Sequence, residues 1–321
     1  MSNDSQDVPH VSDVLAGSPS NWGKWGNDDE VGALNYLGVT EVLAGVATIR
    51  QGKTFTLQAE IGHPHGDMLA PVRQPASKTM AVDQGTFAGD DAPNLPGGAR
   101  YADDVITMFL QGSTQYDALG HVWYDDQLYN GYDASTTIGG LSKVSILPIA
   151  ERGIVGRGVL IDLPRLRGNS RLDPGELITH EDIMAAAAAQ GVELRKRDIL
   201  VIYTGWMEYF YSQEPADFYQ QPEPGLVYSP ELVSWFQEME IPNLVIDTMS
   251  PEQGIDPETG AALLVHSSLM RNLGIAFAEV CRLGELAIDC EQDGQWDFLY
   301  VAAPLKVRNG TGAPVNPVVI K

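Results

Sequence analysis

The sequence predicts an α/β fold in one compact domain, with helices placed between strands. Three observations support this prediction. Short apolar runs typical of buried strands recur along the 321 residues, capped helical segments lie between them, and no internal repeat or clear linker is found. A chain of this length can hold one large domain or two ordinary ones. We therefore expect one domain over residues 21–321, preceded by a loose N-terminal leader over residues 1–20.

The composition restricts the class of protein. Hydrophobic residues make up 44% of the chain, which is typical of a globular protein. The net charge of −23 repels phosphate backbones and anionic lipid, so we expect a small-molecule substrate and neither nucleic acid nor a membrane as partner. The two cysteines form no C-x-x-C motif, and the polar N-terminus lacks an apolar signal segment. These features favour a cytoplasmic protein.

The N-terminal third begins with turns and ends with a strand. Residues 20–37 are dense in Trp, Gly and Asp, which predicts turns with buried aromatic rings. Thr40 is expected to cap a helix that ends at Gly52, and residues 53–61 alternate like a strand. Residues 62–100 are rich in Gly, Pro and Asp and predict a long ordered loop or lid. A strand follows at 104–110.

The remaining elements carry clearer signals. Two helices are bounded by their caps: 179–191, with Thr179 at its start and Gly191 at its end, and 229–239, which opens on Ser229 and a proline. The stretch 266–280 predicts a short helix followed by a strand that begins near Gly274. Buried strands are predicted at 153–165, 197–206, 243–250 and 298–307.

The stretch 111–121, QGSTQYDALGH, has the rhythm of a metal-binding loop. Gln111, Gln115, Asp117 and His121 share parity, so an extended chain directs all four to one face, whereas a helix would divide them. Ten steps of strand would separate the ends by roughly 33 Å, so the chain must bend, at Gly112 and Gly120. Taken alone, the motif also fits a polar strand edge whose histidine bonds a neighbour.

A second pair of polar residues lies near the C-terminus. His266 follows an apolar run and opens a short helix, and Glu279 ends the apolar strand GIAFAEV. A carboxylate there is costly unless it is paired, protonated or bound to a cation. The alternative to a metal ligand is a buried salt bridge with one of three basic residues: Arg271, Arg282 or Lys306.

Other chemistries find little support. No G-x-S-x-G elbow and no G-x-x-x-x-G-K-[ST] phosphate loop is present. His63 and His65 lie in a Pro-Gly loop that typically carries surface residues, and Asp247 after a buried strand is more often a turn residue.

Together these segments resemble the cyclase-type metal-dependent hydrolases, the family of bacterial kynurenine formamidase and isatin hydrolase. The family signature H-x-G-T-H-x-D-x-x-x-H corresponds to QGSTQYDALGH, and its later His and Glu correspond to His266 and Glu279. Residues 21–35 and 303–320 are also similar to the larger members. The resemblance implies a swivelling β/β/α-type fold with a mixed sheet or barrel-like core and flanking helices. It also implies a metal centre and a homo-oligomer, either a dimer or a tetramer.

Two glutamines depart from the signature. Gln111 and Gln115 stand where the family has histidines, a variant similar to trans-dienelactone hydrolase with its Q-x-x-x-Q-x-D-x-x-x-H pattern. The resemblance assigns Asp117, His266 and Glu279 as ligands of one divalent ion, zinc first and manganese second, while a second site is absent. An amide oxygen is a weak ligand for zinc, whereas one His with two carboxylates suffices for a catalytic zinc with an open position.

The expected reaction is hydrolysis of a small cyclic ester, a lactone, by metal-activated water. His121 resembles the catalytic base, and the amides of Gln111 and Gln115 are free to bond the substrate or its oxyanion. Four aromatic residues are candidates for the substrate pocket, although core packing is their ordinary role: Trp22, Trp25, Trp123 and Tyr124.

Three alternatives stay open. An amidase would act on a formamide, a cyclic imide or an isatin-like ring. A homologue that has lost its metal would bind a small molecule or a partner without catalysis. A dehydratase or ring-forming cyclase on the same scaffold has the weakest support.

Overall fold

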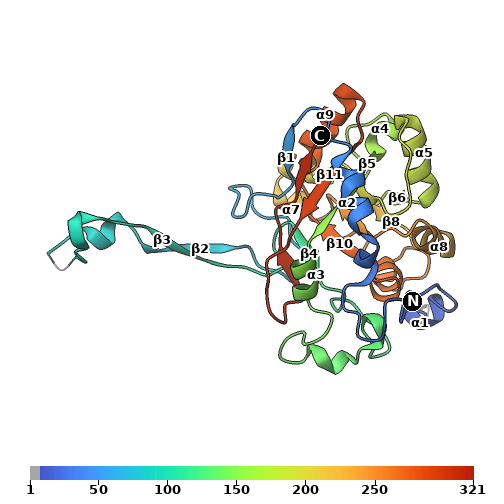
Figure 1. Cartoon of the computed structure of the whole chain (residues 1–321), viewed down its shortest axis with the longest axis horizontal. Coiled ribbons are helices and arrows are strands. Elements are labelled where there is room, and N and C mark those ends of the chain that lie inside the picture. Colours follow the sequence, from blue (N-terminus) through green and yellow to red (C-terminus); the bar gives the residue numbers. More distant parts are fainter. Residues whose placement is uncertain (1–7, 91) are drawn as a thin grey trace, which may run out of the picture.

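A nine-stranded mixed sheet forms the centre of the computed structural model, which describes residues 8–90 and 92–321 (Figure 1). Its strands follow the order β1-β13-β11-β5-β7-β9-β10-β4-β12. The middle strands β5, β7, β9 and β10 run parallel, and antiparallel strands extend the sheet on both sides. The sheet curls into a half-barrel with helices at its flanks. The predicted single α/β domain with a mixed or barrel-like core is confirmed.

The bounds of the strands are β1 (Thr54–Thr56), β2 (Ser77–Val82), β3 (Asp103–Thr107), β4 (Gln115–Asp117), β5 (Ile154–Asp162), β6 (Leu177–Ile178), β7 (Ile199–Tyr203), β8 (Gly225–Leu226), β9 (Asn243–Ile246), β10 (Ala276–Glu279), β11 (Asp297–Ala302), β12 (Gly312–Pro314) and β13 (Val318–Ile320). The parallel strands are apolar and almost wholly buried, as expected for strands covered on both faces.

The bounds of the α-helices are α1 (Val11–Val14), α2 (Val39–Val46), α3 (Ile146–Arg152), α4 (Leu163–Arg167), α5 (His180–Gln190), α6 (Trp206–Ser212), α7 (Pro215–Phe218), α8 (Pro230–Glu238) and α9 (Gly284–Asp293). A π-helical turn, η6 (His266–Asn272), leads into β10. Short 3-10 turns occupy Gly32–Tyr36, Gln84–Phe87, Pro96–Gly98, Tyr129–Gly131 and Ala134–Thr137.

The capped helices form where the sequence predicts them. The Thr179 side chain accepts a hydrogen bond from the Asp182 N–H at the start of α5, and Gly191 ends that helix in the left-handed conformation at φ +68°. Ser229 caps α8 in the same way, accepting from the Leu232 N–H.

Helix α2 differs from its prediction at both ends. It begins at Val39 and ends at Val46, whereas the prediction placed a Thr40 cap and an end at Gly52. Gly38 is the N-cap, and the Glu41 side chain accepts from its N–H at 2.8 Å, so Thr40 lies inside the first turn. Gly45 lets α2 approach β5 closely, because a Cβ there would come within 2.7 Å of the Gly156 backbone.

The N-terminal segment packs on the domain from α1 onward, although residues 1–20 were predicted to be loose. Leu15 is buried against Ala261 and Leu264, and the Tyr228 hydroxyl donates to the Val14 carbonyl at 3.3 Å. These apolar contacts hold the segment in place. Residues 1–7 of the predicted leader lie outside the described residues.

A β-hairpin arm replaces most of the lid predicted for residues 62–100. Strands β2 and β3 pair with each other and carry the chain away from the body, with the short turns Gln84–Phe87 and Pro96–Gly98 at the tip (Figure 1). The strand predicted at 104–110 is therefore β3, which belongs to the arm. The preceding residues 62–76 stay on the body and form the root of the arm.

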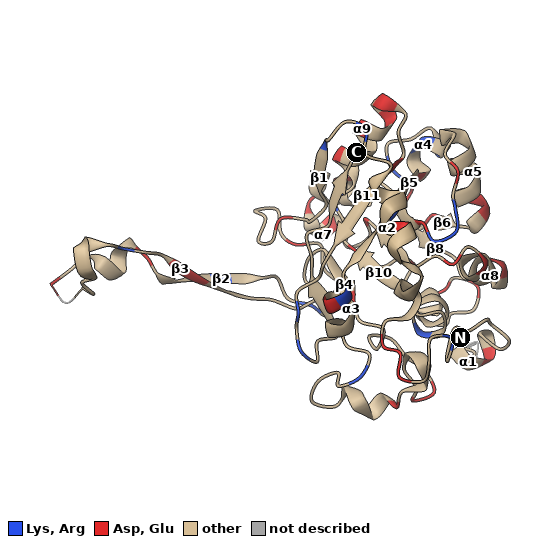
Figure 2. Ribbon diagram, in the orientation of Figure 1, with Lys and Arg blue, Asp and Glu red and all other residues tan. Residues whose placement is uncertain are grey.

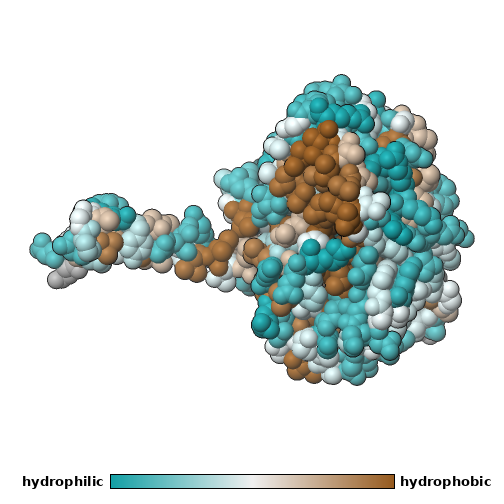
Figure 3. Space-filling view, in the orientation of Figure 1, coloured by the Kyte–Doolittle hydropathy of each residue, from teal (hydrophilic) through white to brown (hydrophobic). Residues whose placement is uncertain are grey.

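Acidic residues and exposed apolar residues gather on different parts of the surface. Acidic residues lie on the outer helices α5, α8 and α9 (Figure 2). A brown area lies beside α2, where Val39, Leu43 and Val46 are exposed (Figure 3). Among the described residues, no helix is long and apolar enough to span a membrane.

Candidate metal centre

Three neighbouring elements bring the predicted metal ligands together. Strand β4 pairs with β10 so that Gln115 lies opposite Glu279, and Asp117 follows two residues later on the same face of β4. His266 is the first residue of η6, which leads into β10. Single π-helical turns occur frequently at functional sites because they redirect side chains.

The three side chains converge in the interior. Asp117, His266 and Glu279 are all buried, and one ligand atom from each lies within 4.8 Å of the others. The His266 Nε2 lies 3.4 Å from Glu279 Oε1 and 4.0 Å from Asp117 Oδ2. One imidazole and two carboxylates at this spacing form a suitable donor set for a divalent ion.

Three of the four carboxylate oxygens of Asp117 and Glu279 lack a hydrogen-bond partner. Both Oδ atoms of Asp117 and Oε1 of Glu279 are buried and accept no hydrogen bond within the described chain. Burial raises the pKa of Asp117 to about 6, and nearby Glu279 adds to this effect while His121 opposes it. A buried carboxylate without a partner is costly, so these oxygens fit a bound cation.

Glu252 orients the histidine of the cluster. Its Oε1 contacts His266 Nδ1 at 2.8 Å and accepts from the His266 backbone N–H at 2.7 Å, while Oε2 accepts from the Val265 N–H at 2.6 Å. Burial alone would lower the pKa of His266, but Glu252 and Glu279 raise it to about 10. With Nδ1 engaged, Nε2 faces the carboxylates. This is the usual outer support of a metal-binding histidine.

The two glutamines bond protein groups. Gln115 is fully buried, and its Nε2 donates to Glu279 Oε2 at 2.8 Å. Gln111 Nε2 donates to the Thr311 hydroxyl at 3.1 Å. Neither lines the cavity described below. The prediction that their amides face the substrate is therefore not what the structure shows, because both NH₂ groups fix the walls of the site.

A cavity of about 530 Å³ opens onto the cluster. Asp117, His121, His266 and Glu279 line it, and the His121 Nε2 lies 4.0 Å from Asp117 Oδ2. Burial lowers the pKa of His121, although Asp117 opposes this. The imidazole is a quarter exposed, so it can exchange a proton with a molecule in the cavity.

Three polar residues of this region were missed in the sequence. Of the described residues that line the cavity, Arg73 is the one Lys or Arg, and its Nη1 donates to the Gln111 carbonyl at 2.9 Å. Glu223 accepts from the Met249 N–H at 3.0 Å, and burial raises its pKa to about 8. Glu252 is the third. A lone arginine between prolines in a Pro-rich stretch was the available signal for Arg73.

The predicted aromatic walls lie elsewhere. None of Trp22, Trp25, Trp123 and Tyr124 lines the cavity. Trp22 donates from Nε1 to the Arg271 carbonyl at 2.8 Å, and Trp25 packs edge-on against Tyr36. The apolar walls include other residues: Val122, Phe218, Tyr219, Met249, Ile255 and Leu263.

The alternative salt bridge of Glu279 does not form. Among the described residues, no Lys or Arg nitrogen lies within 4.0 Å of the Glu279 carboxylate, which instead contacts Gln115 and His266. Arg271 donates to the Gln127 carbonyl and stacks over Tyr124.

The chain is similar to known proteins in sequence and in fold. The model of the Cyclase family matches residues 54–253. A crystal structure described as that of a novel cyclase is 37% identical, with a TM-score of 0.85, and the match covers 94% of this chain and 100% of that one. No curated protein matches the sequence.

More distant structures share the fold. Isatin hydrolase A from Ralstonia solanacearum is 19% identical, with a TM-score of 0.61, over 89% of this chain and 98% of that one. Isatin hydrolase A from Labrenzia aggregata, bound to benzyl benzoate, is 18% identical, with a TM-score of 0.59, over 88% and 98%.

Proposed function

This chain belongs to the Cyclase family, and from that premise we propose that it is a metal-dependent hydrolase that opens a small cyclic ester, a lactone. The observation that carries the proposal is the set of buried, unpartnered carboxylate oxygens of Asp117 and Glu279 beside His266, in the wall of a cavity. Such oxygens are costly unless a cation joins them. The lactone rests on the resemblance of the two-glutamine motif to trans-dienelactone hydrolase.

Asp117, His266 and Glu279 would hold one divalent ion, zinc first and manganese second, which supplies a Lewis acid and lowers the pKa of water. Glu252 keeps the His266 Nε2 directed at the two carboxylates, where the ion would be held, and Gln115 keeps one oxygen of Glu279 in place. These two contacts fix the geometry of the donor set without using further ligands.

His121 acts as the base. Its imidazole accepts the proton of the water whose oxygen attacks the ester carbonyl carbon, and then returns that proton to the ring oxygen as the C–O bond breaks. The product is an open hydroxy acid. The lowered pKa of His121 keeps the imidazole neutral, and so able to accept a proton, at neutral pH.

Arg73 stabilises negative charge in the cavity. Its Nη1 is fixed by the Gln111 carbonyl, and no carboxylate lies within 4.0 Å of its guanidinium among the described residues. The remaining N–H groups can therefore donate to the developing oxyanion or to the product carboxylate.

Hydrolysis of a cyclic amide is the second candidate. The isatin hydrolases share this fold, and the same donor set and base would serve a C–N bond. The two candidates differ in the leaving atom, which is oxygen in a lactone and nitrogen in an amide.

The test uses purified protein loaded with zinc or manganese, and the same protein after dialysis against a chelator. We expect stoichiometric metal, and faster turnover of dihydrocoumarin and γ-butyrolactone than of isatin and succinimide. His121→Ala should lower kcat about 10²–10⁴-fold, and His180→Ala, far from the cavity, is the matched control. Activity that survives both chelation and His121→Ala would show that the mechanism is wrong. Turnover of the cyclic amides alone would replace the lactone with the second candidate.

A further inference from the structure

A second hollow lies beside the cavity that holds the metal cluster, at the root of the hairpin arm. Its volume is about 540 Å³, close to the 530 Å³ of the metal cavity itself. Four residues line both spaces: Ala70, Pro71, Arg73 and Tyr219. The two spaces therefore meet along one rim, and a molecule seated at the metal ligands can extend across that rim into the hollow.

The walls that belong to the hollow alone are mainly apolar. They include Leu69, Pro75, Phe210 and Pro215. Leu69 and Phe210 are buried, so side chains from the root of the arm and from α6 form the base of the hollow. A concave apolar surface that opens to solvent is typical of a site for an apolar group of a ligand.

Tyr219 keeps the rim between the two spaces in shape. Its hydroxyl accepts a hydrogen bond from the Leu69 N–H at 3.0 Å and donates to the Asp67 carbonyl at 3.2 Å. The residue is 41% exposed, so these bonds hold a ring that ligands can reach. Because the rim is fixed before any ligand arrives, binding across it orders little of the protein and costs less entropy.

The charged groups of the hollow already have partners. Asp67 accepts from the Gly62 N–H at 3.0 Å through Oδ1 and from the Ala76 N–H at 3.1 Å through Oδ2. Arg73 donates to the Gln111 carbonyl, and its stem offers methylene groups to the rim. An anionic chain would be repelled by the net charge of −23, and an ammonium group would lose water without gaining a carboxylate. An uncharged group is the ligand that fits.

We propose that the hollow binds an uncharged alkyl substituent of the substrate while the lactone ring lies at the metal cluster. The inference rests on the proposed function and narrows the substrate class to lactones that carry an apolar chain of several carbons. Spaces of roughly 300–1,000 Å³ hold drug-sized ligands, and a bare lactone ring is much smaller than such a ligand. The substituent gives the second space an occupant.

The chain acts on binding and leaves the chemistry unchanged. The reacting carbonyl is held near Asp117, His266 and Glu279, whereas the hollow lies beyond the rim. Contacts so far from the reacting atoms are equally strong in the ground state and in the transition state. They should therefore lower KM and leave kcat nearly constant.

A larger hollow elsewhere in the molecule is the rival site. It has a volume of about 1020 Å³, and charged residues such as Asp162, Arg165 and Glu291 line it. Arg165 pairs with Glu291 there. Within the described chain, none of its lining residues also lines the metal cavity. Of these two hollows, the apolar one is the one that a substrate at the metal ligands reaches.

The test measures kcat and KM of metal-loaded protein for γ-lactones whose side chain grows step by step. The series is γ-butyrolactone, γ-hexalactone, γ-octalactone, γ-decalactone and γ-dodecalactone. We expect kcat/KM to rise about three- to fourfold with each methylene group that enters the hollow, through a falling KM. The rise should stop once the chain fills the hollow.

Two variants of Leu69 place the effect in the hollow. Leu69→Asp adds a charge there, so the ratio of kcat/KM for γ-decalactone to that for γ-butyrolactone should fall about tenfold or more. This ratio is the readout, because a loss of folded or metal-loaded protein lowers both rates alike. Leu69→Trp, which fills the hollow, should lower the ratio as well and serves if the aspartate prevents folding. Val39→Asp, exposed on α2, is the matched control and should keep the wild-type ratio.

The outcomes separate this inference from the proposed function. Turnover of γ-butyrolactone with a kcat/KM that does not change along the series would overturn the inference and leave the proposed function intact, and so would a wild-type ratio in both Leu69 variants. If no lactone is turned over, the proposed function fails, and calorimetry decides the hollow separately. Tighter binding of γ-decalactone than of γ-butyrolactone, lost in Leu69→Asp, would support the hollow, and equal binding of the two would overturn it.

Discussion

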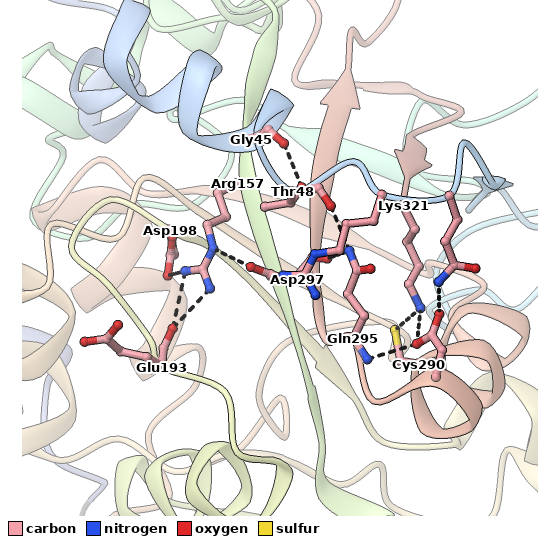
Figure 4. A network of polar contacts seen from close by, with 12 residues as sticks. Gly45, Thr48, Arg157, Glu193, Asp198, Cys290, Gln295, Asp297 and Lys321 are labelled. Atoms are coloured by element: carbon pink, nitrogen blue, oxygen red, sulfur yellow. Dashed lines mark hydrogen bonds and ion pairs between the residues drawn. The ribbon is translucent and has the colours of Figure 1, made fainter.

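Two buried clusters of charge in this protein differ in how their carboxylates are neutralised. In the first cluster, Arg157 on β5 contacts Asp198 at 2.6 Å and Asp297 at 3.1 Å, and it also donates to the Glu193 carbonyl (Figure 4). Nearby, Lys321 contacts Asp289 and Asp293 at 2.8 and 2.9 Å. Each of these carboxylates has a protein cation.

The metal cluster has the same burial without such cations. Asp117, Glu252 and Glu279 surround the single imidazole of His266, and no Lys or Arg lies within 4.0 Å of them among the described residues. The first cluster stabilises the fold, whereas the second leaves oxygens free for a ligand. Incomplete pairing, more than burial, is therefore the sign of function here.

The largest expected effect on stability comes from removing Arg157, the cation that neutralises Asp198 and Asp297. Arg157→Met should lower the free energy of unfolding by about 3–5 kcal/mol, because Asp198 is left buried without its partner. Asp117→Asn in metal-free protein should cost little or stabilise, since it removes a buried carboxylate whose oxygens accept no hydrogen bond and have no Lys or Arg within 4.0 Å among the described residues. Urea denaturation measures both.

A double variant checks the cause of this loss. Arg157→Met/Asp198→Asn should recover part of the stability, because the buried charge is gone. If Asp117→Asn destabilises metal-free protein as much as Arg157→Met does, the contrast between the clusters is wrong.

A smaller effect is expected from changing Glu252, which orients the histidine of the metal cluster. Glu252→Gln keeps an oxygen for the His266 N–H groups but removes the charge, so metal affinity should fall about 10–100-fold. Competition with a chromophoric chelator measures this, and Glu285→Gln, exposed on α9, is the control. Unchanged affinity would mean that Glu252 acts only on folding.

The smallest expected effect on stability concerns Asp293, one of the two carboxylates paired with Lys321. Burial alone would raise the pKa of Asp293, but Lys321, the Gln295 N–H and Gln51 lower it to about 2, below the unfolded value of 3.8. Its stabilisation is thus complete above about pH 4 and is lost as pH falls towards 2. Asp293→Asn should cost about 0.2–1 kcal/mol at pH 7, and the difference from wild type should vanish near pH 2. A gap that persists at pH 2 would indicate lost packing instead.

Local signals explain which elements the sequence predicts well. Helices α5 and α8 carry their own caps in Thr179 and Ser229, and the parallel strands are short apolar runs, so neither depends on distant residues. The sequence predicts β3 as a strand, but it predicts residues 62–100 as a loop or lid, because the exposed β2 lacks the apolar alternation of a half-buried strand.

The residues of the candidate site also divide into those that the sequence predicts and those that it does not. The motif at 111–121 and the later His266 and Glu279 predict all three metal ligands, because the resemblance to a known family connects positions that are far apart in the chain. Arg73 and Glu252 were missed, since their contacts with Gln111 and His266 depend on how loops fold back. The tryptophans were chosen by residue type alone, and such rings usually pack in the interior.

Strand β4 links the identity of the metal ligands to the length of the loop before it. Its pairing with β10 and β12 sets which side chains face the cavity, and a shift of one residue would turn Asp117 away. Inserting or deleting one residue between 108 and 114 would therefore alter the ligand set while leaving the sheet able to form. Sequence changes in the distal arm carry no such penalty, so related chains are free to vary in arm length but not in this short connection.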